Sequence, residues 1–320
     1  MVDIVSEARK VLLIVNPVAG GGGHEALRQL VGARLGGTGA SYEVRVTGKR
    51  GDAFAWSRDS AADLVIVGGG DGTVMEAMSG LIVNERAIPF AIIPGGTANL
   101  LARTFGISSD PEAALETAMT GVAVTLDVGY LPTQDRFFAL VAGAGWDAQL
   151  IADTTRARKD WLGRFAYVVS GVKNLFALKR SRVDLEVDGV RRSFNAHTVM
   201  IFNVGAFPGL GIDFGRGVSP HDGTLDLAVM TATSAFGLAR SAYRVLIRHV
   251  RNDRGITTFS ASRIRITATP PLEVQVDGEP LGRTPLDAEV RPGAATIIVP
   301  IAYAVANGLA TAVETPDAPT

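Results

Sequence analysis

A glycine-rich stretch with one acidic residue, at residues 64–81, has the composition of a phosphate-binding turn. The run of branched apolar residues Leu64–Val67 is typical of a buried strand, and a helical pattern begins near Val74. Between them stands the sequence GGGDGT, which contains Asp71. The backbone N–H groups of such a turn and the N-terminus of the helix bind anions. Because a carboxylate repels a phosphate unless a cation lies between them, Asp71 indicates a Mg²⁺-nucleotide.

Two further strand ends carry polar, glycine-rich turns. The run Val11–Val15 leads into NPVAGGGG, and Phe90–Ile93 leads into PGGTAN. Since the carboxyl ends of parallel strands lie at one edge of a sheet, we expect the three turns to converge. Asn16 either binds a phosphate or caps its own turn, and Thr97 and Asn99 either bind a nucleotide or cap the next helix. Three such turns in succession favour a joint nucleotide site.

The composition and the missing motifs exclude several classes of protein. The 320 residues include no cysteine, which excludes disulfides, a thiolate nucleophile and thiolate metal ligands. The four histidines lack metal-ligand spacing, and a net charge of −1 gives no nucleic-acid footprint. No apolar run of about 18 residues and no signal segment is present, so we expect a soluble, cytoplasmic protein. Neither a GxxxxGK[ST] turn nor the HRD and DFG motifs of protein kinases occur.

The order of the expected elements indicates two domains. In residues 1–130, apolar strands alternate with helices, which is typical of an α/β domain with a mostly parallel sheet. The strands expected there are Val11–Val15, Tyr42–Val46, Leu64–Val67 and Phe90–Ile93. In residues 131–300, short strands between Gly, Pro and Asp turns predict an antiparallel sandwich or barrel. These strands are Phe137–Ala142, Val183–Val187, Thr198–Val204, Thr224–Val229, Ile264–Ala268, Leu272–Val276 and Thr296–Val299. The C-terminal segment 301–320 either frays or packs back on the first domain.

Two predicted helices of the second domain are basic. Trp161–Leu178 is flanked or interrupted by eight cations: Arg156, Arg158, Lys159, Arg164, Lys173, Lys179, Arg180 and Arg182. Ala235–Val250 and the residue after it carry a stripe of four at helical spacing: Arg240, Arg244, Arg248 and Arg251. These faces either contact anionic lipid, each cation contributing about 1 kcal/mol, or are ordinary solvated helix faces.

The motifs NPVAG, GGDGT and GGTAN, in this order and at these intervals, resemble those of the diacylglycerol kinase catalytic superfamily. The likeness is greatest to its soluble bacterial lipid kinases, which are related to sphingosine and ceramide kinases. Asp127-Val128-Gly129, SPHDGTLD at 219–226 and VDGE at 276–279 extend the resemblance over nearly the whole chain. It implies an ATP- and Mg²⁺-dependent kinase that phosphorylates a lipid hydroxyl at the membrane surface, with an α/β nucleotide domain and a β-rich lipid domain. It also implies that a homodimer can form.

The resemblance assigns roles to individual residues. Asp71 would act through Mg²⁺ and water on the phosphates, and Glu279 would be the general base for the lipid hydroxyl, with Asp127 in support. Ser219, Asp222 and Thr224 would form a structural Mg²⁺ site, although Asp222-Gly223 is equally a standard hairpin turn. The residues predicted to bind ATP are Asn16, Pro17, Val18, Ala19, Gly20, Thr47, Gly69, Gly70, Asp71, Gly72, Thr73, Val74, Met75, Thr97 and Asn99.

Two positions depart from the family pattern. Leu100 stands where many relatives have Asp, which removes a carboxylate and bears on which lipid is phosphorylated. Met75 stands where relatives commonly have Asn, which removes a polar contact near the nucleotide. Two alternatives therefore stay open: an NAD kinase-like enzyme, whose further motifs we do not find, and a non-catalytic regulator that binds nucleotide or lipid.

Overall fold

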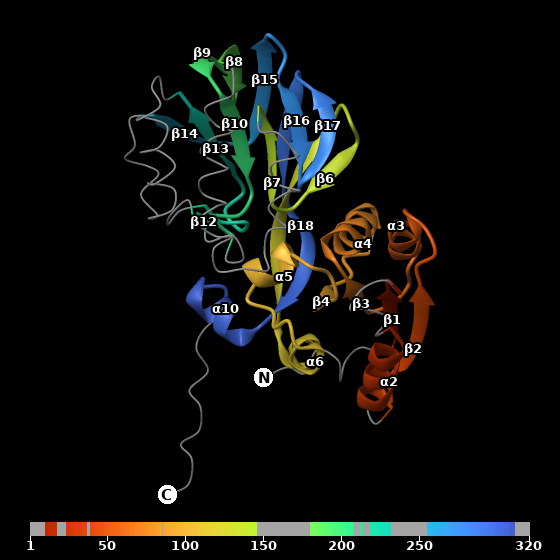
Figure 1. The fold of residues 1–320 in the computed structure, drawn as a ribbon. Helices are drawn as coiled ribbons and strands as arrows, with labels where there is room; N and C mark the ends of the chain where they lie inside the picture. The colour runs from red at the N-terminus through yellow and green to blue at the C-terminus, as the bar shows by residue number, and fades with distance from the viewer. Residues whose placement is uncertain are drawn as a thin grey trace, which may run out of the picture. The chain divides into compact units, whose positions relative to one another are not determined.

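The computed structural model describes residues 10–17, 24–36, 39–84, 86–145, 180–207, 212–213, 218–231 and 255–310 (Figure 1). The described residues form two compact units. The first unit contains the residues up to Thr125 and those from Ala295 onward, and the second contains Leu126–Ala294. The division therefore falls a few residues before the predicted boundary near residue 130, and the end of the described chain belongs to the first unit.

The first unit is built on a parallel sheet in the order β2-β1-β3-β4, with the last residues of β18 beside β4. Its strands are β1 (Lys10–Val15), β2 (Ser41–Val46), β3 (Leu64–Gly69), β4 (Phe90–Pro94) and the end of β18 (Leu286–Val299). Every residue of β3 and β4 is buried, because helices cover both faces of a parallel sheet. The edge strand β2 is the exception, with Tyr42 and Val46 43% and 45% exposed.

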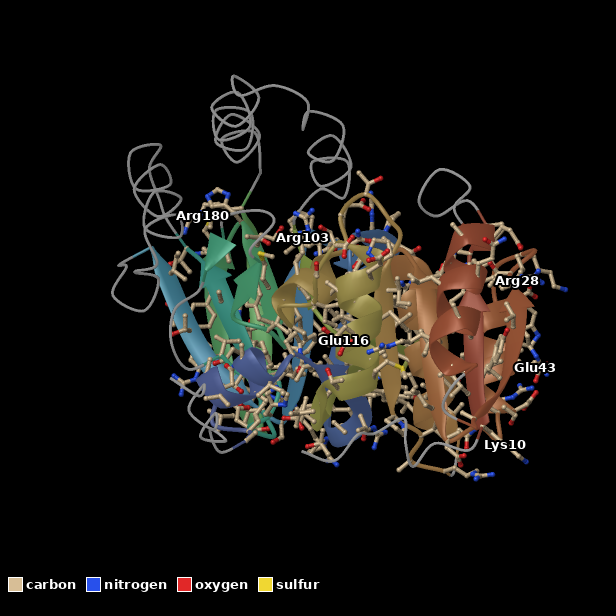
Figure 2. All side chains as sticks on the ribbon, turned by 90° about the horizontal axis from the view of Figure 1, so that it is seen from below. Lys10, Arg28, Glu43, Arg103, Glu116 and Arg180 are labelled. Atoms are coloured by element: carbon tan, nitrogen blue, oxygen red, sulfur yellow. The ribbon has the colours of Figure 1, made fainter. Side chains whose placement is uncertain are left out.

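Helices cover the two faces of this parallel sheet (Figure 1). The helices described in the first unit are α2 (His24–Leu35), α3 (Asp52–Arg58), α4 (Asp71–Val83), α5 (Leu100–Thr104), α6 (Pro111–Thr120) and α10 (Ile301–Ala306). On one side α3 packs on α4, where a Cβ on Gly80 would lie 2.3 Å from the carbonyl oxygen of Phe54. On the other side α2 lies beside α6, whose Glu116 is labelled in Figure 2. Glu116 forms an ion pair with Arg34 of α2.

The C-terminal helix of the described chain, α10, packs within the first unit. The ring of Tyr303 meets the ring of Phe105 edge-on, with 5.3 Å between their centroids. Burial raises the pKa of Tyr303 to about 12. Residues 301–310 therefore pack back on the first unit, which contains the parallel sheet. Residues 311–320 lie outside the described residues.

The second unit is a sandwich of antiparallel sheets. One sheet has the order β14-β13-β10-β7-β16-β17; the other joins the first part of β18 to β15, β8 and β9, with β5 and β6 beside β18. Alternate residues of the strands face a shared apolar core, to which Val183, Ile201 and Leu286 contribute. The strands are β5 (Val122–Leu131), β6 (Arg136–Phe138), β7 (Val141–Ala144), β8 (Ser181–Val187), β9 (Val190–Ala196), β10 (Thr198–Phe202), β13 (Leu225–Met230), β14 (Ile256–Ala261), β15 (Arg263–Thr269), β16 (Glu273–Val276) and β17 (Glu279–Arg283), with β11 (Ala206–Phe207) and β12 (Ile212–Asp213) forming a separate pair.

The predicted fold class, a mostly parallel α/β domain followed by a β-rich domain, is confirmed, but one predicted strand is wrong. The single strand expected at Phe137–Ala142 is two strands, β6 and β7. The N–H groups of Ala139 and Leu140, at the break, donate to the carboxylate of Asp277 instead of to a neighbouring strand. The predicted helices Trp161–Leu178 and Ala235–Val250 lie outside the described residues.

Candidate active site

Asn16, directly after β1, joins the first glycine-rich turn to the second. Its backbone N–H donates to the carbonyl oxygen of Gly68 over 2.9 Å. Its side-chain Nδ2 donates to Oγ1 of Thr73, in the first turn of α4, over 3.0 Å. Asn16 therefore fixes the start of α4 against the end of β1. Pro17 follows it, whereas Val18, Ala19 and Gly20 lie outside the described residues.

The second and third turns are in direct backbone contact. The N–H of Gly95 donates to the carbonyl oxygen of Gly69 over 2.8 Å. A Cβ built on Gly96 would lie 2.6 Å from Cα of Gly70 and 2.9 Å from Oδ1 of Asn99. The two turns can approach this closely because both positions lack a side chain. The convergence expected from the parallel sheet is thus present for Asn16 and the second and third turns, and the glycines of the first turn lie outside the described residues.

We expect Gly96→Ala to destabilise the protein by about 1–3 kcal/mol, because the new methyl group must push one turn away from the other. Thermal or denaturant unfolding, followed by circular dichroism, measures the change. Gly72→Ala is the matched control, since a Cβ there meets no heavy atom within 4 Å. Equal stabilities for the two variants would contradict the backbone contact.

Of the two roles expected of Asn99, the structure excludes one, because its side chain does not cap the next helix. The residue adopts the left-handed conformation with a φ of 47°, and its side chain does not cap α5. Instead, its Oδ1 accepts from the N–H of Gly96 and its Nδ2 donates to the carbonyl oxygen of Gly96, both over 2.8 Å. These two bonds close the third turn on itself and occupy both ends of the amide. ATP contact by Asn99 stays a prediction, and Thr97 in the same turn is exposed.

The group that caps α5 is Asp71, from the second turn. Its Oδ1 accepts from the backbone N–H of Leu101 over 3.1 Å. The carboxylate is half-buried in the first turn of α4, where the helix dipole stabilises a negative charge. Asp71 thus has one oxygen oriented by α5, at the place where the second and third turns meet.

The donor set around Asp71 fits Mg²⁺ bound together with a nucleotide. Among the described residues, no group of three or more His, Cys, Asp or Glu side chains could hold a metal ion. Mg²⁺ is commonly held by one or two carboxylates, with phosphate oxygens and water as its other ligands. A single carboxylate beside a glycine-rich turn is therefore sufficient, and Asp71 is the residue that would hold the ion.

The loop after β2, which contains the predicted ATP-binding residue Thr47, lies beside the end of β1. The N–H of Thr47 donates to the carbonyl oxygen of Val15 over 2.8 Å, so the loop lies beside the end of β1. The N–H groups of the next two residues donate to Oδ2 of Asp52, and these bonds hold the pKa of Asp52 below its ordinary value. Glu76 of α4 accepts the N–H of Gly51 over 2.9 Å. Sequence reasoning missed Glu76, which has no local signal.

In the second unit, Glu279 stands at the start of β17, just after a tight turn. Asp277 and Gly278 have positive φ values of 47° and 86°, as in the two-residue turns that close β-hairpins. The carboxylate of Glu279 is 46% exposed, and its Oε2 accepts from Nη2 of Arg136 over 2.7 Å. Sequence reasoning missed Arg136, which is 143 residues away along the chain.

Asp277 fixes the turn that presents Glu279. Its carboxylate accepts the N–H groups of Ala139, Leu140 and Val141 over 2.8–3.1 Å, and its own N–H donates to the carbonyl oxygen of Val141. Burial raises the pKa of Asp277 to about 6, although these backbone bonds and Arg136 act in the opposite direction. The first residue of the DGE motif is therefore a structural clamp on the segment between β6 and β7.

Asp127 joins three segments of the second unit. It is 5% exposed, and its two carboxylate oxygens accept from the N–H groups of Gly223 and Gly293 over 2.6 and 2.7 Å. Its backbone N–H donates to the carbonyl oxygen of Pro220. Nδ2 of Asn203 donates to its backbone oxygen. These hydrogen bonds give Asp127 a structural role. That Asp127 also supports Glu279 in catalysis stays a prediction.

The turn predicted to hold a structural Mg²⁺ is closed by its own hydrogen bonds. Oδ1 of Asp222 accepts both the backbone N–H and the hydroxyl of Thr224, over 3.0 and 2.9 Å. This is the arrangement of an Asx-type turn, which needs no metal. The metal role of Ser219, Asp222 and Thr224 therefore stays a prediction.

Comparisons with known proteins agree with this two-part architecture. Residues 10–131 match the family model of the diacylglycerol kinase catalytic domain, and residues 140–299 match that of the YegS C-terminal NAD kinase beta sandwich-like domain. A diacylglycerol kinase of Bacillus subtilis is 31% identical over 258 residues, which cover 77% of this chain and 82% of that protein. A probable YegS-like lipid kinase of Cronobacter sakazakii is 28% identical, over 80% of this chain and 85% of that protein. A solved structure of a putative diacylglycerol kinase from Bacillus anthracis superimposes with a TM-score of 0.77 at 28% identity, covering 93% of this chain and 99% of that one.

Proposed function

This chain belongs to the diacylglycerol kinase catalytic-domain family of lipid kinases, and from that premise we propose that it transfers the γ-phosphoryl group of ATP to a lipid hydroxyl, with Mg²⁺ required. The observation that carries the proposal is the meeting of Asn16 and the glycine-rich turns after β3 and β4 around Asp71 in the first unit.

The first unit binds the phosphates. Backbone N–H groups of the glycine-rich turns and the N-terminus of α4 donate hydrogen bonds to the phosphate oxygens. Asn16 and the pair Gly70 and Gly96 keep these turns in place, so the donors need no rearrangement when the nucleotide arrives. Mg²⁺, when bound near Asp71, neutralises charge on the phosphate oxygens.

The second unit activates the acceptor. Arg136 holds one oxygen of the Glu279 carboxylate. The carboxylate accepts the proton of the lipid hydroxyl while the hydroxyl oxygen of the lipid attacks the γ-phosphorus. The bond from the γ-phosphorus to the β,γ-bridging oxygen breaks, and ADP leaves. The products are a lipid phosphate, ADP and a proton.

Contact with an anionic membrane surface is part of the proposal. The basic segments that would make it, within residues 156–182 and 235–251, lie almost wholly outside the described residues. Of the cations at their borders, Arg180 bonds the carbonyl oxygen of Asn195, and Arg182 pairs with Asp184. Within the described part of the chain, no helix has the length and apolarity that crossing a bilayer requires. Cytoplasmic location and a homodimer stay predictions.

Phosphoryl transfer from radiolabelled ATP into mixed micelles tests the proposal directly. The acceptors are diacylglycerol, monoacylglycerol, phosphatidylglycerol, sphingosine and ceramide, each assayed with Mg²⁺ and with a chelator in its place. NAD is assayed as a further acceptor, because the second domain matches a family model described as NAD kinase-like. We expect label in one or more lipids, and none without a divalent cation.

Two results would overturn the proposal. Label in NAD alone would assign the chain to NAD phosphorylation. No transfer to any acceptor, with ATP binding shown by calorimetry, would assign it to nucleotide-dependent regulation instead.

A further inference from the structure

The ion pair between Arg136 of β6 and Glu279 of β17 differs from the ion pair that lies within the hairpin of β16 and β17. The Arg136 side chain is 29% exposed, and its Nη2 lies 2.7 Å from Oε2 of Glu279. The neighbouring pair, Arg283 with Glu273, has the same 2.7 Å separation, but its side chains are 67% and 61% exposed. The Glu279 side chain is 46% exposed, so water screens the first pair less than the second. The Arg136–Glu279 pair is therefore the one that can hold a carboxylate in a defined orientation.

The backbones that carry both members of this pair are themselves fixed. Arg136 begins β6, where it is paired with Leu131 in the ladder with β5. On the other side, Oε1 of Gln275 accepts the N–H of Gly278, directly before Glu279, over 3.0 Å. The clamp of Asp277 on residues 139–141 then ties the hairpin to the segment that follows Arg136. The guanidinium and the carboxylate thus meet with little backbone freedom on either side.

We propose that Arg136 is a positioning residue for Glu279, holding Oε2 so that the rest of the carboxylate is directed to the proton of the lipid hydroxyl. Its positive charge also offsets the repulsion between the Glu279 carboxylate and an approaching phosphate. Since proton transfer requires the base within hydrogen-bond reach of the hydroxyl, a swing of the side chain by about 1 Å can lower the rate on the order of 10²-fold. The inference rests on the proposed function, in which Glu279 is the general base.

A double-mutant cycle tests this role. The variants are Arg136→Gln, Glu279→Gln and the double variant, each assayed for kcat and for the KM of ATP with the lipid that accepts label. We expect Arg136→Gln alone to lower kcat on the order of 10²-fold while the KM for ATP is unchanged. In the Glu279→Gln background the same change should have no further effect, because there is no carboxylate left to position. Arg136→Lys keeps the charge and should restore most of the lost kcat.

The outcomes separate the inference from the proposed function. Effects of the two single changes that multiply in the double variant would overturn the positioning role, as would a normal kcat for Arg136→Gln. Full activity of Glu279→Gln would instead overturn the proposed base. Arg283→Gln, which removes the exposed ion pair of the same hairpin, is the matched control and should leave kcat unchanged. If Arg136→Gln does not fold, Arg136→Lys still decides: a loss of kcat as large as that of Glu279→Gln contradicts a role based on charge.

Discussion

Glu279→Gln is expected to lower kcat for lipid phosphorylation by about 10²–10⁴-fold, the usual contribution of a general base. The amide has nearly the same shape as the carboxylate but takes up no proton at neutral pH. Its oxygen can still accept a hydrogen bond from Arg136, so the hairpin keeps its geometry. The KM for ATP and the melting temperature should therefore stay close to those of the unchanged protein.

Steady-state kinetics with the accepted lipid, together with a thermal melt, measure these quantities. The matched control is Glu273→Gln, because Glu273 lies on the same hairpin and pairs with an arginine at the same distance, but is 61% exposed. Loss of an exposed ion pair costs about 0–1 kcal/mol of stability and should leave kcat intact. Equal activities of the two variants would contradict a catalytic carboxylate at Glu279.

Asp71→Asn is expected to lower kcat on the order of 10²–10³-fold and to raise the Mg²⁺ concentration needed for half-maximal activity. Charge stabilisation by a bound metal is worth several kcal/mol, and each 1.4 kcal/mol corresponds to about a tenfold change in rate. Asparagine retains an oxygen that can accept the N–H of Leu101, so α5 keeps its cap. The loss of charge at the start of α4 should cost only about 0.3–1 kcal/mol of stability.

A titration of activity with Mg²⁺, at saturating ATP and lipid, distinguishes the two effects. Asp110→Asn is the matched control: Asp110 also accepts a backbone N–H at the start of a helix, from Ala113 at the N-terminus of α6. Asparagine is an equally good residue for that position, so neither activity nor stability should change. An unchanged Mg²⁺ requirement in Asp71→Asn would show that this carboxylate does not act with the metal.

Strands β1, β3 and β4 of the first unit could be predicted from the sequence because nearly all of their residues are buried. Runs such as Leu64–Val67 and Phe90–Ile93 are apolar at every position, and the structure extends each of them by only one or two residues. The glycine-rich turns come directly after the apolar runs of β1, β3 and β4 in the sequence, so their positions could be predicted as well. Once those strands are parallel and adjacent, their carboxyl ends must lie together.

Some elements were not predicted, for different reasons. Strand β9 has mostly polar and exposed residues, because it is the edge of its sheet. Helix α6 was missed although Asp110-Pro111 is a good start signal, which could have been found. The break between β6 and β7 has no local signal, since the carboxylate that causes it, Asp277, is 136–138 residues away.

The sequence by itself predicted phosphate chemistry from glycine-rich turns with an aspartate, and its resemblance to a lipid-kinase family singled out the DGE turn. These are local properties of residue type and spacing. Only the tertiary structure decided how the side chains are used. In the structure, Asp71 caps α5, and the side-chain amide of Asn99 bonds Gly96. Both carboxylate oxygens of Asp127 accept hydrogen bonds from glycine N–H groups. The tertiary structure also brings Arg136 to Glu279. Each of these except the Asn99 bond joins residues 30 or more positions apart, and such partners are brought together by the packing of strands and helices rather than by the neighbouring sequence.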